Sequence, residues 1–165
     1  MLKSTFGNSP YSKYKIRMTA YILTVILIIF DRFFKFLAVN DFFSKPMEII
    51  GDSFKLNFVG NFNIAFSLPL AGFWLNVIII FLVLALIYNL LYFIKKRDYQ
   101  KADYLLFIIF GAISNLLDRL RYGYVIDYFD LKYFTVFNLA DVMIVGGVIG
   151  LGWLILSVGG QVVKK

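Results

Sequence analysis

The stretch Gly72–Ile94 reads GFWLNVIIIFLVLALIYNLLYFI and contains no charged residue. Its length matches the roughly 20 residues that an α-helix needs to cross the hydrocarbon core of a bilayer. Over the 165 residues, 61% are hydrophobic and only 16% are charged. A soluble domain is nearer half apolar and a quarter charged. The stretch therefore predicts a membrane-spanning helix in a membrane protein.

Three further apolar stretches have a similar length. They are Thr19–Val39, Tyr104–Tyr124 and Phe137–Val158. We therefore expect an all-α membrane protein with four transmembrane helices that form a single integral membrane domain over residues 1–165.

The first apolar stretch also invites an alternative interpretation as a secretory signal peptide, because Lys13, Lys15 and Arg17 precede it. No small-x-small cleavage pattern closes the stretch, however, and Asp31 and Lys35 lie in its second half. These features favour a retained helix.

Basic residues gather on alternate sides of the four stretches. The positive-inside rule places the segments richest in Lys and Arg in the cytoplasm. It predicts cytoplasmic tails over residues 1–18 and 159–165, a cytoplasmic loop over 95–103 and an extracytoplasmic loop over 40–71. Both termini would then be cytoplasmic. The acidic residues are distributed the opposite way, since eight of the ten fall toward the outer side: Asp31, Asp41, Glu48, Asp52, Asp118, Asp127, Asp130 and Asp141.

The outer loop over residues 40–71 is longer than a simple connector needs. Within it Phe54, Leu56 and Phe58 alternate with polar residues after a Gly-Asp-Ser turn signal at 51–53. Alternation with a period of two is typical of a β-strand. We expect a small β-rich flap between the first two helices, resting on the membrane surface.

The composition also restricts the chemistry. The chain has no His and no Cys, which excludes Ser-His-Asp and Cys-His catalysis and zinc sites of the His/Cys type. We expect no metal and no cofactor. The net charge of +7 does not indicate nucleic-acid binding, because the basic residues flank apolar runs as topology determinants do.

Ionisable side chains inside the expected spans are costly and indicate function. Asp31 and Lys35 are four residues apart and share a helix face. Asn115, Asp118 and Arg119 share a face of the third stretch in the same way. The structural alternatives are a self-neutralising pair with Lys35 reaching outward to water, and an ion pair made by Arg119.

Two further carboxylates follow, Asp127 in an apolar, strand-like run and Asp141 in the first turn of the fourth helix. Either could be structural, and Asp141 could simply cap its helix. The topology nevertheless brings both to the same membrane face as Asp31 and Asp118. Two carboxylates held close in a site of low dielectric constant share a proton, which is the arrangement of an aspartic protease.

Four motifs resemble those of the bacterial type II (lipoprotein) signal peptidases, and they occur in the same order. The longest is Gly111-Ala112-x-x-Asn115-x-x-Asp118-Arg119-x-x-x-Gly123-x-Val125-x-Asp127. The others are Phe137-Asn138-x-Ala140-Asp141-x-x-Ile144, Asp31-x-x-x-Lys35, and Asn61 with Ala65-Phe66. The departures are Asn63, Ile64, Phe110, Ser114 and Val142, which put substrate fit and inhibitor sensitivity in question more than the chemistry.

The resemblance implies that Asp127 and Asp141 are the catalytic dyad. It implies that seven other residues shape or bind the site: Asp31, Lys35, Asn61, Asn115, Asp118, Arg119 and Asn138. The implied substrate is the signal peptide of a prolipoprotein whose cysteine carries diacylglycerol, cut just before that cysteine. The implied location is the bacterial cytoplasmic (inner) membrane, with the site toward the extracytoplasmic face. Membrane lipids are the other expected partner, and we expect a monomer.

Two rival interpretations remain from the sequence. Paired intramembrane carboxylates also relay protons in small transporters, although here the charges gather at one face. An inactive relative that still binds lipidated peptides would carry the same motifs, and only activity distinguishes it.

Overall fold

The structure is a computed structural model that describes residues 10–43, 45–62 and 72–162. It contains four long helices, which correspond to the four apolar stretches: α1 (Pro10–Val39), α2 (Phe73–Lys95), α3 (Tyr99–Tyr122) and α4 (Leu139–Val162). α1 begins at Pro10, well before the expected Thr19, so part of the expected tail over residues 1–18 is helical. α4 likewise continues to Val162, into the expected tail over 159–165.

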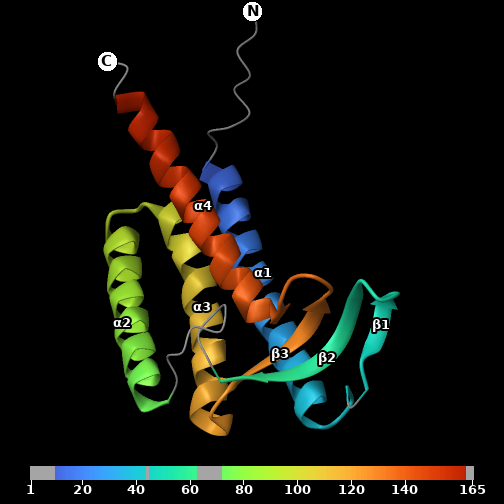
Figure 1. The fold of residues 1–165 in the computed structure, drawn as a ribbon. Coiled ribbons are helices and arrows are strands. Elements are labelled where there is room, and N and C mark those ends of the chain that lie inside the picture. The colour runs from blue at the N-terminus through green and yellow to red at the C-terminus, as the bar shows by residue number, and fades with distance from the viewer. Residues whose placement is uncertain (1–9, 44, 63–71, 163–165) are drawn as a thin grey trace, which may run out of the picture.

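The helices run alternately up and down, with a β-sheet at one end of the bundle (Figure 1). We call this end the sheet end; α1 and α3 finish there, and α2 and α4 begin there. α3 packs against each of the other three helices, so it is the central element. Its buried face carries Leu105, Ile108 and Ile109 against α2 and α4, and then Ser114, Asn115 and Asp118 nearer the sheet end.

The sheet has four antiparallel strands in sequential order: β1 (Met47–Ile50), β2 (Phe54–Asn61), β3 (Val125–Leu131) and β4 (Val136–Phe137). β2 lies where the alternation of Phe54, Leu56 and Phe58 predicts a strand. β1 and β2 form the expected β-rich segment between the first two helices, but the sheet extends beyond it, because β3 and β4 come from the connection between α3 and α4. β2 pairs with β3 along its length, so the two connections share one backbone hydrogen-bond ladder.

A small hydrophobic cluster joins this sheet to the end of α1. Ala38 and Phe43 pack there with Leu56 of β2 and with Ile126 and Tyr128 of β3, and all five are buried. Phe34 stacks on Tyr128 with ring centroids 5.3 Å apart. The sheet is thus held on the bundle by apolar contacts on one face, which positions β3 beside the polar ends of α1, α3 and α4.

Within the part of the chain that the structure describes, two helices are long and apolar enough to cross a membrane: α2, and α4 over Leu139–Ser157. Only 6% of the apolar window of α2 and 17% of that of α4 is buried inside the protein. A soluble core helix would bury such a surface, whereas here Phe73, Trp74 and Phe81 are exposed over most of their area. The two helices therefore present an apolar surface suited to lipid.

α1 and α3 do not meet the same criterion over the described residues. Charges near both ends shorten their uncharged stretches to Met18–Phe30 and Tyr104–Leu117. Both uncharged stretches are shorter than the roughly 20 residues that a span needs. That α1 and α3 also cross the membrane therefore stays a prediction. The charges near the C-terminal ends of both helices lie at the sheet end, where they form part of the site described below.

Close packing of α3 on α4 depends on glycine. A Cβ at Gly147 would come within 2.6 Å of Ile108 Cγ1 and 2.9 Å of the Tyr104 carbonyl oxygen. A Cβ at Gly146, the preceding residue on the same helix, would meet nothing within 4 Å. Small residues at such crossings are typical of helix packing in membranes.

Gly147→Ala is expected to lower the free energy of unfolding by about 1–3 kcal/mol, because the added methyl group meets backbone and cannot be accommodated by a rotamer change. Gly146→Ala is the matched control and is expected to be neutral or to stabilise the helix by up to about 1 kcal/mol. Unfolding of both variants in detergent micelles checks this expectation. Equal stability of the two variants would contradict the packing seen at Gly147.

Candidate active site

A buried lysine links the two helices that carry most of the site. Lys35 of α1 places its Nζ 2.7 Å from Asp118 Oδ2 of α3 and 3.1 Å from Asp31 Oδ2 one turn earlier on α1. All three side chains are fully buried. Buried charges are tolerated only when they are paired and hydrogen-bonded. The alternative in which Lys35 reaches outward to water is therefore wrong.

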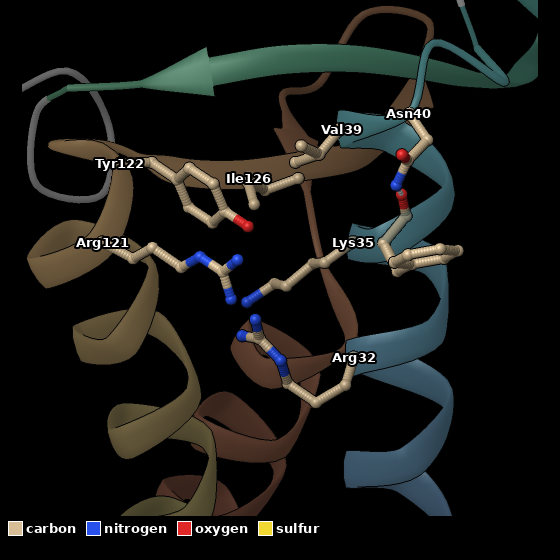
Figure 2. A pocket seen from close by; sticks show the side chains of 8 residues that line it. Arg32, Lys35, Val39, Asn40, Arg121, Tyr122 and Ile126 are labelled. Atoms are coloured by element: carbon tan, nitrogen blue, oxygen red, sulfur yellow. Dashed lines mark hydrogen bonds between the residues drawn. The ribbon is translucent and has the colours of Figure 1, made fainter.

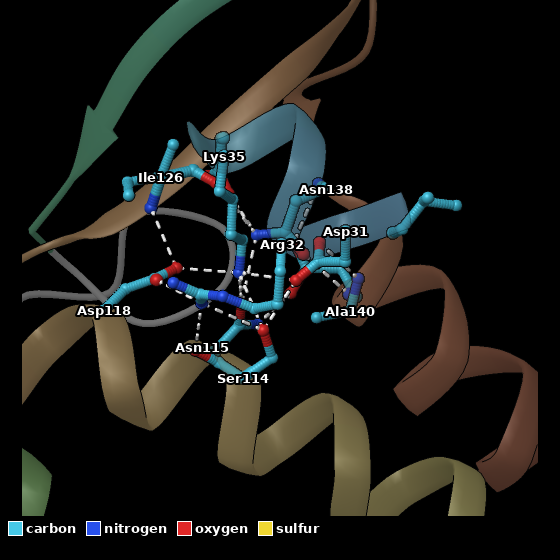
Figure 3. A network of polar contacts seen from close by, with 12 residues as sticks. Asp31, Arg32, Lys35, Ser114, Asn115, Asp118, Ile126, Asn138 and Ala140 are labelled. Carbon is cyan, nitrogen blue, oxygen red and sulfur yellow. Dashed lines mark hydrogen bonds and ion pairs between the residues drawn. The ribbon is translucent and has the colours of Figure 1, made fainter. Parts of the chain in front are cut away.

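Asp118 has a second cationic partner, which the sequence motifs did not single out. Arg32 Nη1 lies 2.7 Å from Asp118 Oδ1 and also donates to the Ser114 hydroxyl at 3.2 Å. The backbone N–H of Ile126 donates to Asp118 Oδ2 at 3.4 Å, which joins this carboxylate to β3. Asp118 thus connects α3, α1 and the sheet (Figure 3).

Asp31 accepts three hydrogen bonds besides its contact with Lys35. The Ser114 hydroxyl donates at 2.6 Å, the Tyr128 hydroxyl at 3.0 Å and the Ala140 backbone N–H at 3.2 Å. Burial raises the pKa of Tyr128, which keeps the phenol protonated as a donor. Asp31 therefore joins α1 to α3, β3 and the start of α4.

Asn115 links Lys35 to a second set of polar residues, which includes Asn138 and Asp141. Its Oδ1 accepts from Lys35 at 2.8 Å and from Asn138 at 3.2 Å, and its Nδ2 donates to Asp141 Oδ1 at 2.7 Å. A cation on one side and a carboxylate on the other define which amide atom is oxygen. Asn115 is thus locked in a single orientation.

A capping box at the start of α4 holds Asp141. Asn138 Oδ1 accepts from the Asp141 backbone N–H at 2.9 Å, and Asp141 Oδ2 accepts from the Asn138 backbone N–H at 3.2 Å. This reciprocal pattern satisfies donors at the helix N-terminus. Capping is therefore one role of Asp141, and its other oxygen is held by Asn115.

Asp127 lies on β3, beside this capping box. Asn138 Nδ2 donates to its Oδ1 at 2.7 Å, and Asn61 Nδ2, from β2, donates to its Oδ2 at 3.0 Å. Burial first, and then the nearby charge of Asp141, raise the pKa of Asp127 to about 7, against the opposing effect of the two amide donors. The two carboxylates therefore interact electrostatically, and Asn138 bonds to both.

Arg119 lies on α3 next to this pair and is half-buried. Its charge interacts with those of Asp127, Asp141 and Asp118. All nine residues expected from the motifs thus meet at the sheet end, in one network of contacts or within its electrostatic reach.

Three members of this network were not predicted as site residues: Arg32, Ser114 and Tyr128. Ser114 was noted only as a departure from the family motif, yet its hydroxyl bonds to Asp31 and lies within 3.4 Å of Lys35 Nζ. Val142, another departure, is largely exposed on α4. Asn63, Ile64, Ala65 and Phe66 lie outside the described residues.

Chemically, two interacting carboxylates of which one holds a proton near neutral pH can deprotonate a water molecule and donate a hydrogen bond to a carbonyl group. Over residues 10–43, 45–62 and 72–162, no group of three or more acidic side chains is arranged to hold a metal ion.

The sequence matches the profile of the family described as "Signal peptidase (SPase) II" over residues 23–157. It is 37% identical over 144 residues to the lipoprotein signal peptidase of Caldicellulosiruptor bescii, an alignment that covers 87% of this chain and 95% of that protein. It is 33% identical over 144 residues to the lipoprotein signal peptidase of Haemophilus influenzae, covering 82% of each chain.

Solved structures support the fold. A bacterial membrane enzyme determined by the in meso method at 2.3 Å resolution superposes with a TM-score of 0.72 over 84% of this chain and 88% of that chain, at 23% identity. A second, at 1.9 Å resolution, gives a TM-score of 0.68 and covers 92% of its chain.

Lys35→Met is expected to lower the free energy of unfolding by about 3–5 kcal/mol, because it leaves two buried carboxylates with one cation. Lys101→Met is the control; Lys101 pairs with Asp98 at 2.7 Å, but both side chains are partly exposed. That variant is expected to lose less than about 1 kcal/mol. Thermal or denaturant unfolding in detergent measures both, and similar losses would argue against a special role for the buried lysine.

Proposed function

The chain belongs to the signal peptidase II family of aspartic proteases, and on that premise we propose that Asp127 and Asp141 are its catalytic dyad. Membership makes it a membrane-bound lipoprotein signal peptidase, an enzyme that removes signal peptides from prolipoproteins. The observation that carries the dyad proposal is the position of Asn138, which donates from its side chain to Asp127 and forms the capping box with Asp141. Asn138 thereby donates to both carboxylates, from its side chain to Asp127 and from its backbone N–H to Asp141.

In the proposed mechanism the dyad holds one proton. Asp127 carries it near neutral pH, since burial and the charge of Asp141 raise its pKa to about 7. Asp141 is the ionised partner, because it lies at the N-terminus of α4, where the helix dipole and two hydrogen-bond donors favour negative charge. This division of roles gives one base and one acid at the same site.

The ionised Asp141 takes a proton from water, and the resulting hydroxide attacks the scissile carbonyl carbon. Asp127 donates its proton to the carbonyl oxygen as the tetrahedral intermediate forms. The C–N bond then breaks, the amine leaves with the proton held by Asp141, and the carbonyl oxygen returns its proton to Asp127. The dyad ends in its starting protonation state, as hydrolysis requires.

The remaining residues have positioning roles in this proposal. Asn61 and Asn138 orient Asp127, and Asn115 orients Asp141. Lys35 holds Asn115 through a 2.8 Å hydrogen bond and is itself held by Asp31 and Asp118. Arg119 adds a positive charge near both catalytic carboxylates, where it would stabilise the ionised one.

The proposed substrate is a prolipoprotein whose cysteine already carries diacylglycerol, cut just before that cysteine. The names of the relatives support lipoprotein precursors as the substrate class. The exposed apolar helix surfaces support a site reached from within the bilayer. We further propose that the enzyme is a monomer and has lipids as its other partners.

The proposed topology has four spans in the bacterial cytoplasmic membrane, with both chain termini and the loop over residues 95–103 in the cytoplasm. It is supported by the distribution of basic residues, since Lys95, Lys96 and Arg97 lie at the turn opposite the sheet. The sheet end, with the dyad, would then face the extracytoplasmic side. Because the buried polar residues gather at this end, the proposal favours hydrolysis over a proton relay across the membrane.

Asp127→Asn and Asp141→Asn are each expected to lower kcat by about 10²- to 10⁴-fold, because asparagine keeps the shape of aspartate but cannot transfer the proton. The assay is cleavage of a diacylglyceryl-modified prolipoprotein by purified enzyme. Asp130→Asn is the matched control on the same strand, since Asp130 bonds only to Asn57 among the described side chains. It is expected to leave kcat nearly unchanged.

Folded but inactive dyad variants beside an active Asp130→Asn would support the assignment. If wild-type protein binds the lipidated peptide and does not cut it, the chain is an inactive relative. Activity retained in either dyad variant would remove that residue from the chemistry.

The pH dependence of kcat is expected to be bell-shaped, because only the dyad with one proton is active. The rate should rise as the dyad loses its first proton and fall as Asp127 loses its own above about pH 7. Initial rates between about pH 4 and pH 9 in mixed buffers at constant ionic strength measure the profile. A rate that is flat across this range would contradict a shared proton.

A further inference from the structure

A polar cavity of about 440 Å³ lies between the ends of α1 and α3, and its lining includes Lys35 of the site described above. Three cationic side chains converge in it, Arg32 and Lys35 from α1 and Arg121 from α3 (Figure 2). Tyr122 and Asn40 contribute to its wall. Like charges gathered at one point repel one another unless a negative charge balances them.

Two of the three cations are balanced by protein groups. Lys35 contacts Asp31 and Asp118, and Arg32 contacts Asp118, so two carboxylates serve two cations. Arg121 has no such partner within the part of the chain that the structure describes: no carboxylate lies within ion-pair distance of its guanidinium group. Its side chain is exposed and lies over the Tyr122 ring, 5.2 Å from the centroid. The cavity therefore has one positive charge in excess.

Hydrogen-bond donors for an anion remain available there. The bonds that Arg32 makes to Asp118 and Ser114 all leave from Nη1, so the rest of its guanidinium group makes no hydrogen bond to residues 10–43, 45–62 or 72–162. The guanidinium group of Arg121 and the hydroxyl of Tyr122 have no hydrogen-bond partner among the described residues. Planar guanidinium groups suit phosphate oxygens because they offer paired N–H donors.

An apolar groove of about 310 Å³ adjoins this cavity and shares Arg32 and Arg121 with it. Leu117 and Leu120 of α3 form its wall and are 51% and 60% exposed. An anion at the cavity with an acyl chain in the groove would match both surfaces.

We propose that this cavity binds the phosphate group of an anionic phospholipid from the surrounding bilayer. Arg32, Arg121 and Tyr122 bond to the phosphate, and Leu117 and Leu120 contact an acyl chain. A soluble phosphate would use the cavity and leave the groove empty, and for that reason the lipid is the occupant to which both features point. The proposal depends on α3 lying in the membrane and does not depend on the catalytic dyad.

Binding of single lipids to the full-length protein in detergent, followed by native mass spectrometry, tests the proposal. The probes are phosphatidylglycerol, phosphatidylcholine with the same acyl chains, and inorganic phosphate as competitor. Arg121→Gln removes the excess charge at an exposed side chain, and Arg121→Lys keeps it. Lys95→Gln, at the opposite end of the bundle, controls for the loss of any one positive charge.

Arg121→Gln is expected to weaken binding of the first phosphatidylglycerol about tenfold, the loss expected for one hydrogen bond to a charged group. Arg121→Lys should lose less, and Lys95→Gln and all phosphatidylcholine affinities should stay unchanged. Equal affinity of wild type and Arg121→Gln for phosphatidylglycerol would overturn the proposal. Displacement of the lipid by millimolar inorganic phosphate would also overturn it, since the site would then be one for a soluble anion. Loss of cleavage in the dyad variants has no bearing on either result, because lipid binding is read without catalysis.

Discussion

The buried ammonium group of Lys35 is the interaction on which the rest of the site depends. It lies between the carboxylates of Asp31 and Asp118 and hydrogen-bonds to Asn115, so one charge joins α1 to α3. Removing three charges from water is costly, and the cost is met only if each keeps its partners. Three other elements supply partners to the two carboxylates: Ser114 from α3, Tyr128 and Ile126 from β3, and Ala140 from α4. The charges therefore specify how these elements meet.

The positions of the Asp127 and Asp141 carboxylates depend on this arrangement indirectly, through two asparagine side chains. Neither carboxylate forms a hydrogen bond with Lys35. Asn115 bonds to both Lys35 and Asp141, and Asn138 bonds to both Asp141 and Asp127. Amides suit this position because they can bond to a cation or carboxylate without adding charge. The site thus contains two sets of side chains. The charged set holds the helices together, and the set of amides orients the two carboxylates.

The sheet positions a residue of the site, and the helix bundle keeps an exposed apolar surface. β2 and β3 come from separate connections, and their pairing places Asn61 opposite the start of β3, within hydrogen-bond distance of Asp127. Apolar contacts with Ala38 and Phe43 fasten the sheet to α1. The outer surfaces of α2 and α4 remain apolar and exposed, since lipid takes the place of a protein core there.

The sequence by itself determined the four helices, a strand at Phe54, Leu56 and Phe58, and the residues that would gather at one end, because apolar runs and the period of a strand are local properties of the chain. It also indicated the family, through motifs whose residues are spaced by helix geometry. Only the tertiary structure decided that Lys35 points inward, that Arg32 pairs with Asp118, and that Ser114 and Tyr128 belong to the network. It alone decided that one sheet is built from both connections. The physical reason is that these contacts join residues some 80 to 110 positions apart, and their partners follow from how α1 crosses α3 and where β3 is held, which no local pattern records.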